Sequence, residues 1–152
     1  MWVYLLDSSP ATAEVTRLLM EQAQLGEQHV ICTERRRWEE VWPPRVQEGK
    51  SIPARILFLL DSALPTDLGE SVVGALEQVE SVCPQSTYMA LTLVAPGRNR
   101  TLPEAICSFP GWRGELVKPI DTHLLRYILQ TRFPSSQLQS DGSRPGADAR
   151  EG

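Results

Sequence analysis

Five short apolar runs alternate along this chain with segments of helical periodicity, and this alternation limits the possible folds more than any other feature. The runs cover about 2–6, 28–32, 55–60, 88–94 and 114–117. Short apolar runs separated by amphipathic segments are typical of a parallel β-sheet flanked by helices. The third run, Ile56-Leu-Phe-Leu-Leu60, is apolar throughout, as in strands that are buried on both faces. The sequence therefore predicts an α/β fold with five strands.

The segments between the runs predict helices whose first residues are marked by capping signals. Ser9 is the expected N-cap of the first helix, with Pro10 at its first position. A second helix is expected over about 34–42, a third over about 67–82, and a last one from the N-cap Asp121. Residues at helical spacing are Val15, Leu18, Leu19 and Gln22 in the first helix, Leu68, Val72, Val73, Leu76 and Val79 in the third, and Leu124, Leu125, Ile128 and Leu129, expected to point inward, in the last.

Two parts of the chain predict little regular structure. Prolines and glycines between 95 and 113 leave room only for a short helix near 102–108. Beyond Pro134 the sequence has almost no apolar residues, which is the composition of a disordered segment. We therefore expect one folded domain over 1–133 and a disordered tail over 134–152.

Length, charge and cysteine content narrow the class of protein. A chain of 152 residues is long enough to bury a core of its own. The net charge of −4 speaks against sequence-independent nucleic-acid binding, which relies on clustered Lys and Arg, so no direct nucleic-acid partner is expected. The three cysteines lack CxxC spacing, which favours neither a disulfide framework nor a zinc site and indicates a cytoplasmic protein. Because Asp7 interrupts the first run after a few residues, we expect neither a signal peptide nor a membrane span.

Three of the predicted strands run directly into charged side chains. The first ends on Asp7, the third on Asp61, and the fifth on Lys118, which is followed by Pro119. Open α/β sheets bind ligands beyond the carboxyl ends of their strands, and parallel neighbours would bring these three side chains together there. A purely structural alternative stays open, in which Asp61 caps its own loop by accepting N–H bonds and Lys118 forms an ion pair between strand ends.

An acid after the first strand, an acid after the third and Lys-Pro after the fifth together resemble the receiver domain of bacterial response regulators, the CheY-like fold. Asp61 is followed four and eight residues later by Pro65 and Gly69, which belong to the same pattern. The likeness covers about 1–133. It implies a flavodoxin-like (βα)5 fold, with a parallel sheet in the strand order 2-1-3-4-5 and helices on both faces.

The resemblance also implies functional roles. Asp61 matches the phosphoacceptor, whose carboxylate attacks a phosphohistidine on a partner, and Lys118 would pair with a phosphoryl oxygen. Asp7, Asp61 and the backbone carbonyl of Ala63 would hold Mg²⁺. Such a protein is a signalling module of a two-component phosphorelay and not an enzyme. Its partner would be a histidine kinase, a phosphotransfer protein or a downstream signalling protein, and a homodimer is an open possibility.

Three positions depart from the receiver pattern. Ser8 stands where receivers usually carry a second acid, so Mg²⁺ should bind more weakly. Val94 ends the fourth strand where a Thr or Ser hydroxyl usually bonds the phosphoryl group, and Thr92 could replace it only if the register shifted by a full pleat. Glu115 stands where the fifth strand usually has a switch aromatic.

These departures leave alternatives open. One is a pseudo-receiver, a scaffold that keeps the fold and works without phosphorylation. Another, much less favoured, is a phosphatase-like hydrolase, which needs a second acid two residues after the nucleophile, whereas Ser9 and Ala63 at those places are neutral. Trp38, Trp42 and Trp112 are assigned to core packing, with a partner-binding patch as the alternative.

Overall fold

The chain alternates strands and helices, as the sequence predicts. The structure is a computed structural model that describes residues 1–44, 52–97 and 100–133, so the predicted tail over 134–152 lies outside the described residues. In chain order the elements are β1 (Trp2–Leu6), α1 (Pro10–Gln22), β2 (Gln28–Cys32), α2 (Arg35–Val41), β3 (Arg55–Asp61), α3 (Thr66–Glu77), α4 (Val79–Val82), β4 (Thr87–Val94), the 3₁₀ helix η1 (Glu104–Ser108), β5 (Trp112–Val117) and α5 (Thr122–Arg132).

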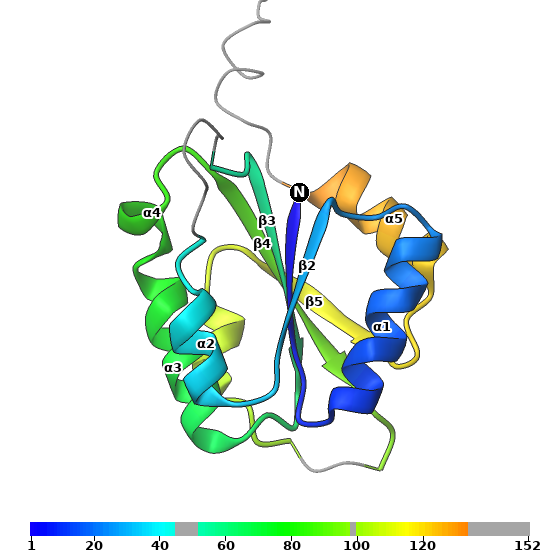
Figure 1. The fold of residues 1–152 in the computed structure, drawn as a ribbon, viewed down its shortest axis with the longest axis horizontal. Coiled ribbons are helices and arrows are strands. Elements are labelled where there is room, and N and C mark those ends of the chain that lie inside the picture. Colours follow the sequence, from blue (N-terminus) through cyan, green and yellow to red (C-terminus); the bar gives the residue numbers. More distant parts are fainter. Residues whose placement is uncertain (45–51, 98–99, 134–152) are drawn as a thin grey trace, which may run out of the picture.

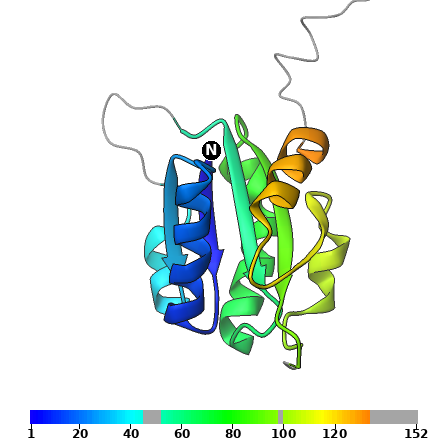
Figure 2. The same ribbon diagram turned by 90° about the vertical axis from the view of Figure 1, so that its right-hand side faces the viewer.

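The five strands form one parallel sheet in the order β2-β1-β3-β4-β5. Strand β1 lies between β2 and β3, and its first residue, Trp2, is paired with Gln28 of β2 and with Ile56 of β3. Helices α1 and α5 cover one face of the sheet, and α2 and α3 cover the other (Figures 1 and 2). The expected flavodoxin-like (βα)5 fold, with its strand order and its helices on both faces, is therefore confirmed.

Along the central strands, the side chains of alternate residues pack into two separate hydrophobic layers, one on each face of the sheet. Leu57 and Leu59 of β3 pack in the layer under α1 and α5, whereas Phe58 and Leu60 pack in the layer under α2 and α3. All four side chains are fully buried, and each contributes roughly 1.5–3 kcal/mol through the hydrophobic effect. This burial on both faces holds β3, and with it Asp61, at the centre of the fold.

The buried faces of two helices do not coincide with the residues that the sequence places at helical spacing. In α1 the buried residues are Ala13, Thr16 and Met20, whereas Val15 and Leu18 are 50% and 42% exposed. Thr16 can be buried because its hydroxyl donates to the carbonyl of Thr12, 3.1 Å away, within the helix. In α5 the expected residues Leu125, Ile128 and Leu129 are buried, but Leu124 is 46% exposed. The predicted third helix is interrupted at Gln78, which separates α3 from α4.

Among the described residues between β4 and β5, η1 is the only helix, close to the short helix expected near 102–108. Glycines let it lie close to its neighbours. A Cβ on Gly69 would lie 3.1 Å from the Pro103 ring, and one on Gly111 would lie 2.7 Å from the Phe109 ring. The contact of Pro103 with Gly69 holds this segment against α3.

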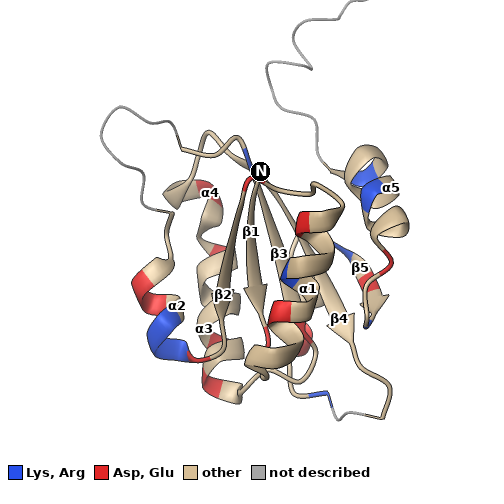
Figure 3. Cartoon of the chain, turned by 45° about the vertical axis from the view of Figure 1, so that its right-hand side comes forward, with Lys and Arg blue, Asp and Glu red and all other residues tan. Residues whose placement is uncertain are grey.

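Helix α2 has the mixed charge that its sequence suggests. Arg35 pairs with Glu39 at 3.2 Å and Arg37 with Glu40 at 3.7 Å, all four side chains being largely exposed. Figure 3 shows basic and acidic segments side by side on this helix.

Within the described residues, no helix is both long enough and apolar enough to cross a membrane.

Candidate functional site

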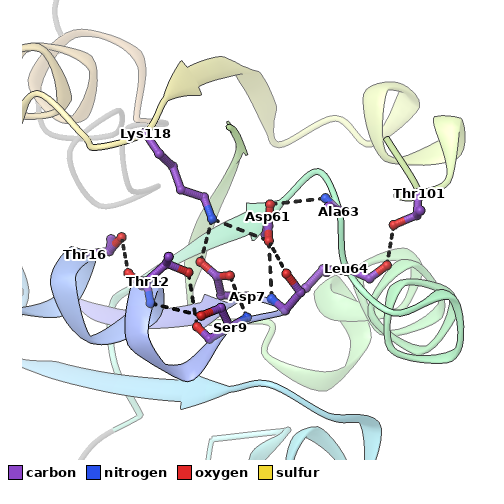
Figure 4. Close-up of polar contacts among 10 residues, drawn as sticks. Asp7, Ser9, Thr12, Thr16, Asp61, Ala63, Leu64, Thr101 and Lys118 are labelled. Carbon is purple, nitrogen blue, oxygen red and sulfur yellow. Dashed lines mark hydrogen bonds and ion pairs between the residues drawn. The ribbon is translucent and has the colours of Figure 1, made fainter. Parts of the chain in front are cut away.

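The charged residues that follow β1, β3 and β5 meet at the carboxyl edge of the sheet. The Lys118 ammonium lies 2.7 Å from Oδ2 of Asp7 and 3.5 Å from Oδ2 of Asp61 (Figure 4). Both carboxylates are almost completely buried, with side-chain exposures of 4% and 2%. The strand order explains the meeting, because β1 and β4 flank β3 and β5 lies next to β4.

The Asp61 carboxylate is surrounded by hydrogen-bond donors. The backbone N–H and the hydroxyl of Ser8 donate to Oδ2, at 3.3 Å and 3.0 Å, and the N–H of Ala63 donates to Oδ1 at 3.2 Å. Burial alone raises the pKa of Asp61, but the Ala63 amide, the Asp7 side chain, the Lys118 ammonium and the Ser8 amide together hold it below the ordinary value. Asp61 is therefore ionised at neutral pH.

Asp7 joins the same edge to the start of α1. Its Oδ1 accepts the N–H of Ser9 at 3.0 Å. Ser9 is the N-cap of α1, as its sequence predicts, and its hydroxyl accepts the N–H of Thr12 at 3.4 Å. The loop after β1 is thus fixed by side-chain bonds to its own backbone, which holds Asp7 against Lys118.

The residues at this edge do not fit a typical Mg²⁺ site. Mg²⁺ requires near-octahedral oxygen coordination. Asp7 and Asp61 offer carboxylates, but Lys118 already lies against both, and Ser8 donates to Asp61 where a further carboxylate would add a ligand. Across 1–44, 52–97 and 100–133, no cluster of three or more His, Cys, Asp or Glu residues could hold a metal ion.

The end of β4 does not bring a hydroxyl to Asp61. Leu93 lies opposite Asp61 in the register, and Val94 is the next and last residue of the strand. Thr92 lies opposite Leu60 and is fully buried, and its hydroxyl accepts the Trp112 indole N–H at 3.0 Å. Thr92 therefore does not take the place of Val94, and the register expected from the sequence holds.

Glu115 of β5 forms an ion pair with the guanidinium of Arg100. A bulge between the pairs Ala90–Trp112 and Thr92–Glu115 adds one residue to β5. Neither the Trp112–Thr92 bond nor the Arg100–Glu115 pair can be predicted from the apolar pattern, because a bulge leaves no mark in that pattern and Arg100 lies in a loop without periodicity.

The loop after β4 is hydrogen-bonded to the loop that follows Asp61. The N–H groups of Thr101 and Leu102 both donate to the carbonyl of Ser62, at 2.8 Å and 3.0 Å. The Thr101 hydroxyl donates to the carbonyl of Leu64 (Figure 4). A displacement of the Asp61 loop would therefore be transmitted to the start of the β4–β5 crossover. Sequence reasoning missed this role for Thr101, which stands in a stretch without periodicity.

The other side chains that the sequence singled out lie outside this edge. Trp38 and Trp42 stack at 5.3 Å and contact the Tyr4 and Phe58 rings, so both belong to an aromatic cluster under α2. The cysteines are free thiols.

Comparisons with known proteins agree with this architecture. No protein-family model matches the sequence, and no curated protein matches it significantly. A response regulator receiver protein from Dyadobacter fermentans superposes with a TM-score of 0.61 at 19% identity, over 89% of this chain and 99% of that one. The bacteriophytochrome response regulator AtBRR gives 0.57 at 20% identity, over 85% and 89%. The receiver domain of Ssk1 from Saccharomyces cerevisiae, crystallised with the histidine phosphotransfer signalling protein Ypd1, gives 0.53 at 16%, over 83% of each chain.

Proposed function

We propose that this chain, which has the CheY-like receiver fold, is a receiver-type signalling module in which Asp61 is the phosphoacceptor. The observation that carries the proposal is the state of Asp61. It is a buried carboxylate at the end of a central strand, its pKa is lowered, and a lysine ammonium lies 3.5 Å away. A carboxylate held in its ionised form beside a cation has the charge state and the neighbour that phosphoryl transfer requires.

In the proposed reaction a carboxylate oxygen of Asp61 attacks the phosphorus of a phosphohistidine. The new O–P bond forms as the N–P bond breaks, and the imidazole nitrogen leaves with the electron pair and is protonated from solvent. Lys118 then pairs with a phosphoryl oxygen, and the Ser8 and Ala63 N–H groups are placed to donate to the modified acid. Asp7, Asp61 and the Ala63 carbonyl would hold Mg²⁺ only weakly, because Lys118 already lies against both carboxylates.

The proposed partner is a protein that carries phosphohistidine, either a histidine kinase or a phosphotransfer protein. The co-crystal of the Ssk1 receiver domain with a histidine phosphotransfer protein supports this class of partner for a receiver fold. Output is proposed to pass through contacts that this domain makes with other proteins.

A pseudo-receiver is the second candidate function, and specific contacts favour it. Lys118 lies closer to Asp7 than to Asp61, and the Ser8 hydroxyl already occupies Oδ2 of Asp61. Val94 supplies no hydroxyl at the end of β4, and Glu115 replaces the switch aromatic. These features weaken the chemistry while they leave the fold intact.

One experiment separates the two functions. The full chain is incubated with acetyl phosphate and with a phosphohistidine-bearing phosphotransfer protein, with and without Mg²⁺, and its intact mass is measured. Addition of one phosphoryl group to wild type and to Asp67→Asn, an acid in the first turn of α3, but not to Asp61→Asn, supports the receiver function. Absence of label from wild type under all conditions favours the pseudo-receiver, and label on Asp61→Asn shows that Asp61 is not the acceptor.

A further inference from the structure

A cavity of about 340 Å³ lies between α3, α4, the start of β4 and η1. Tyr88, one of its lining residues, is opposite Ile56 at the start of β3, whereas Asp61 is the last residue of that strand. The cavity is therefore at the other end of the sheet from Asp61, and none of the proposed phosphoacceptor residues lines it.

The cavity exists because the β4–β5 crossover carries a short 3₁₀ helix. Pro103 rests on Gly69 of α3 at one end of this segment, and Phe109 packs over Gly111 at the other. The Phe109 ring stacks on Tyr88 with centroids 5.5 Å apart. Between these two anchors the segment leaves a hollow beside the C-terminal half of α3, lined on its apolar side by Val73, Leu76, Tyr88, Ile106 and Phe109.

Two carboxylates, Glu77 and Glu80, stand at the rim of this apolar hollow, and both are exposed. The Tyr88 hydroxyl donates to Oε1 of Glu80 at 2.7 Å, which orients that carboxylate and leaves its second oxygen for another donor. Burial and the Glu80 carboxylate raise the pKa of Tyr88 to about 12, so the hydroxyl remains a donor at neutral pH. Among the residues that the structure describes, neither Glu77 nor Glu80 has an ion-pair partner.

We propose that this cavity binds an arginine side chain, with an apolar neighbour, presented by a partner protein. Charge complementarity selects a cation, because two acids of like charge flank an apolar floor that contains no base. Arginine fits better than lysine, since its planar guanidinium pairs with carboxylates and also stacks on aromatic rings such as that of Phe109. The volume lies at the lower end of the range of about 300–1,000 Å³ typical of small-ligand pockets, so it suits one or two side chains.

The probe is the blocked tripeptide acetyl-Leu-Arg-Leu-amide, titrated into the ¹⁵N-labelled full chain and followed by NMR. Saturable shifts are expected at Val73, Tyr88 and Phe109. Replacing the arginine of the probe by citrulline, which is neutral and similar in shape, should weaken binding roughly fivefold, as for the loss of exposed charge pairs. Absence of saturable shifts at the cavity, or equal binding of the citrulline peptide, overturns the proposal.

Variants of the chain test the same assignment. The double substitution Glu77→Gln and Glu80→Gln should weaken the arginine peptide roughly fivefold. Glu70→Gln, an exposed residue of α3 that does not line the cavity, is the matched control and should leave binding unchanged. Gly111→Ala should also weaken binding, because its Cβ would displace the Phe109 ring.

Two further outcomes are informative. If Glu70→Gln weakens binding as much as the double variant does, the effect is general electrostatics and the proposal fails. If agmatine alone binds as tightly as the peptide, the cavity is a small-molecule site and the assignment to a partner protein is overturned. Binding should be the same in Asp61→Asn, so failure of the phosphoacceptor proposal leaves this test intact.

Discussion

At the scale of single residues, one ammonium group forms ion pairs with two buried carboxylates. Lys118 is the only cation of the described residues in ion-pair contact with Asp7 and Asp61. Removing one partner of a buried ion pair is costly because the remaining charge is left uncompensated. The same lysine therefore stabilises the fold, whether or not Asp61 is ever phosphorylated.

Lys118→Met should lower the free energy of unfolding by about 3 kcal/mol, because it leaves two neighbouring carboxylates without a counter-ion. Urea denaturation at neutral pH measures the change. Lys118→Arg keeps the charge and serves as the control. Adding Asp7→Asn to Lys118→Met should recover part of the loss, and a Lys118→Met variant as stable as wild type would contradict this account.

The lowered pKa of Asp61 predicts a loss of stability in acid. Because the folded-state pKa lies below the unfolded value of about 3.9, Asp61 contributes its full stabilisation above that value and loses it as pH falls through the folded-state pKa. Urea midpoints measured as pH is lowered from 6 should fall less steeply for Asp61→Asn than for wild type, with the difference developing below about pH 4–5. Equal slopes for Asp61→Asn, wild type and the exposed-site variant Glu70→Gln would show that Asp61 has no lowered pKa.

Ser8→Asp should tighten Mg²⁺ binding about tenfold, because it places a second carboxylate beside Asp7, as in the pair of acids that receivers usually carry after the first strand. Isothermal titration calorimetry with Mg²⁺ measures the affinity. Ser9→Asp is the matched control, since it adds the same charge one residue later and still provides an N-cap for α1. If both variants tighten binding equally, the effect is due to net charge and not to a ligand at residue 8.

At the scale of the elements, β4 and β5 are joined by a side-chain bond as well as by their ladder. The Trp112 indole N–H bonds the hydroxyl of Thr92, which is fully buried. Trp112 lies opposite Ala90, two residues before Thr92, so its indole reaches along the neighbouring strand to the Thr92 hydroxyl. The bond joins β4 and β5, the strands that carry Val94 and Glu115.

Trp112→Phe should destabilise the protein by about 1–3 kcal/mol, since it leaves the buried Thr92 hydroxyl without its donor. Thr92→Val in the same chain should remove most of that penalty, because both polar partners are then replaced by apolar groups. Chemical denaturation of the four members of this double-mutant cycle gives the coupling energy, expected at about 0.5–1.5 kcal/mol. A coupling energy near zero would mean that the bond contributes nothing to stability.

The strands were more predictable than the helix faces. β3 could be recognised because a strand buried on both sides is apolar at every position, as in Ile56–Leu60. Leu124 is exposed although its spacing predicts that it points inward, because the buried face of a helix depends on what it packs against. For the same reason Thr16 is buried despite its polar side chain. In the site, Asp7, Asp61 and Lys118 could be located from strand ends alone. The contacts of Thr92, Arg100 and Thr101 could not, because they depend on a bulge and a loop without periodic signals.

At the scale of the whole molecule, burial is concentrated in three central strands. β1, β3 and β4 are buried along most of their length, whereas β2 and β5 form the edges of the sheet and are more exposed. Regions with few buried contacts open more readily than the core. The stability of the molecule should therefore decrease outward from β3.

Native-state hydrogen exchange should resolve this gradient. Amides of β1, β3 and β4 are expected to exchange only through global unfolding, with opening free energies of about 5–15 kcal/mol. The amides of η1 and of residues 100–102 should exchange by local opening. Mass spectrometry of peptic fragments measures the exchange. Protection of η1 equal to that of β3 would show that the β4–β5 crossover is part of the stable core.

The position of β1 between β2 and β3 also determines when the fold can form during synthesis. Trp2 of β1 pairs with both Gln28 and Ile56, so β1 lacks one neighbour until the ribosome has released β3. Pairing over such separations is slow because a long loop must close first, and until then the nascent chain exposes apolar side chains that chaperones bind. Of Asp7, Asp61 and Lys118, the lysine is synthesised last, because it follows β5. No fragment that stops before it contains the complete site.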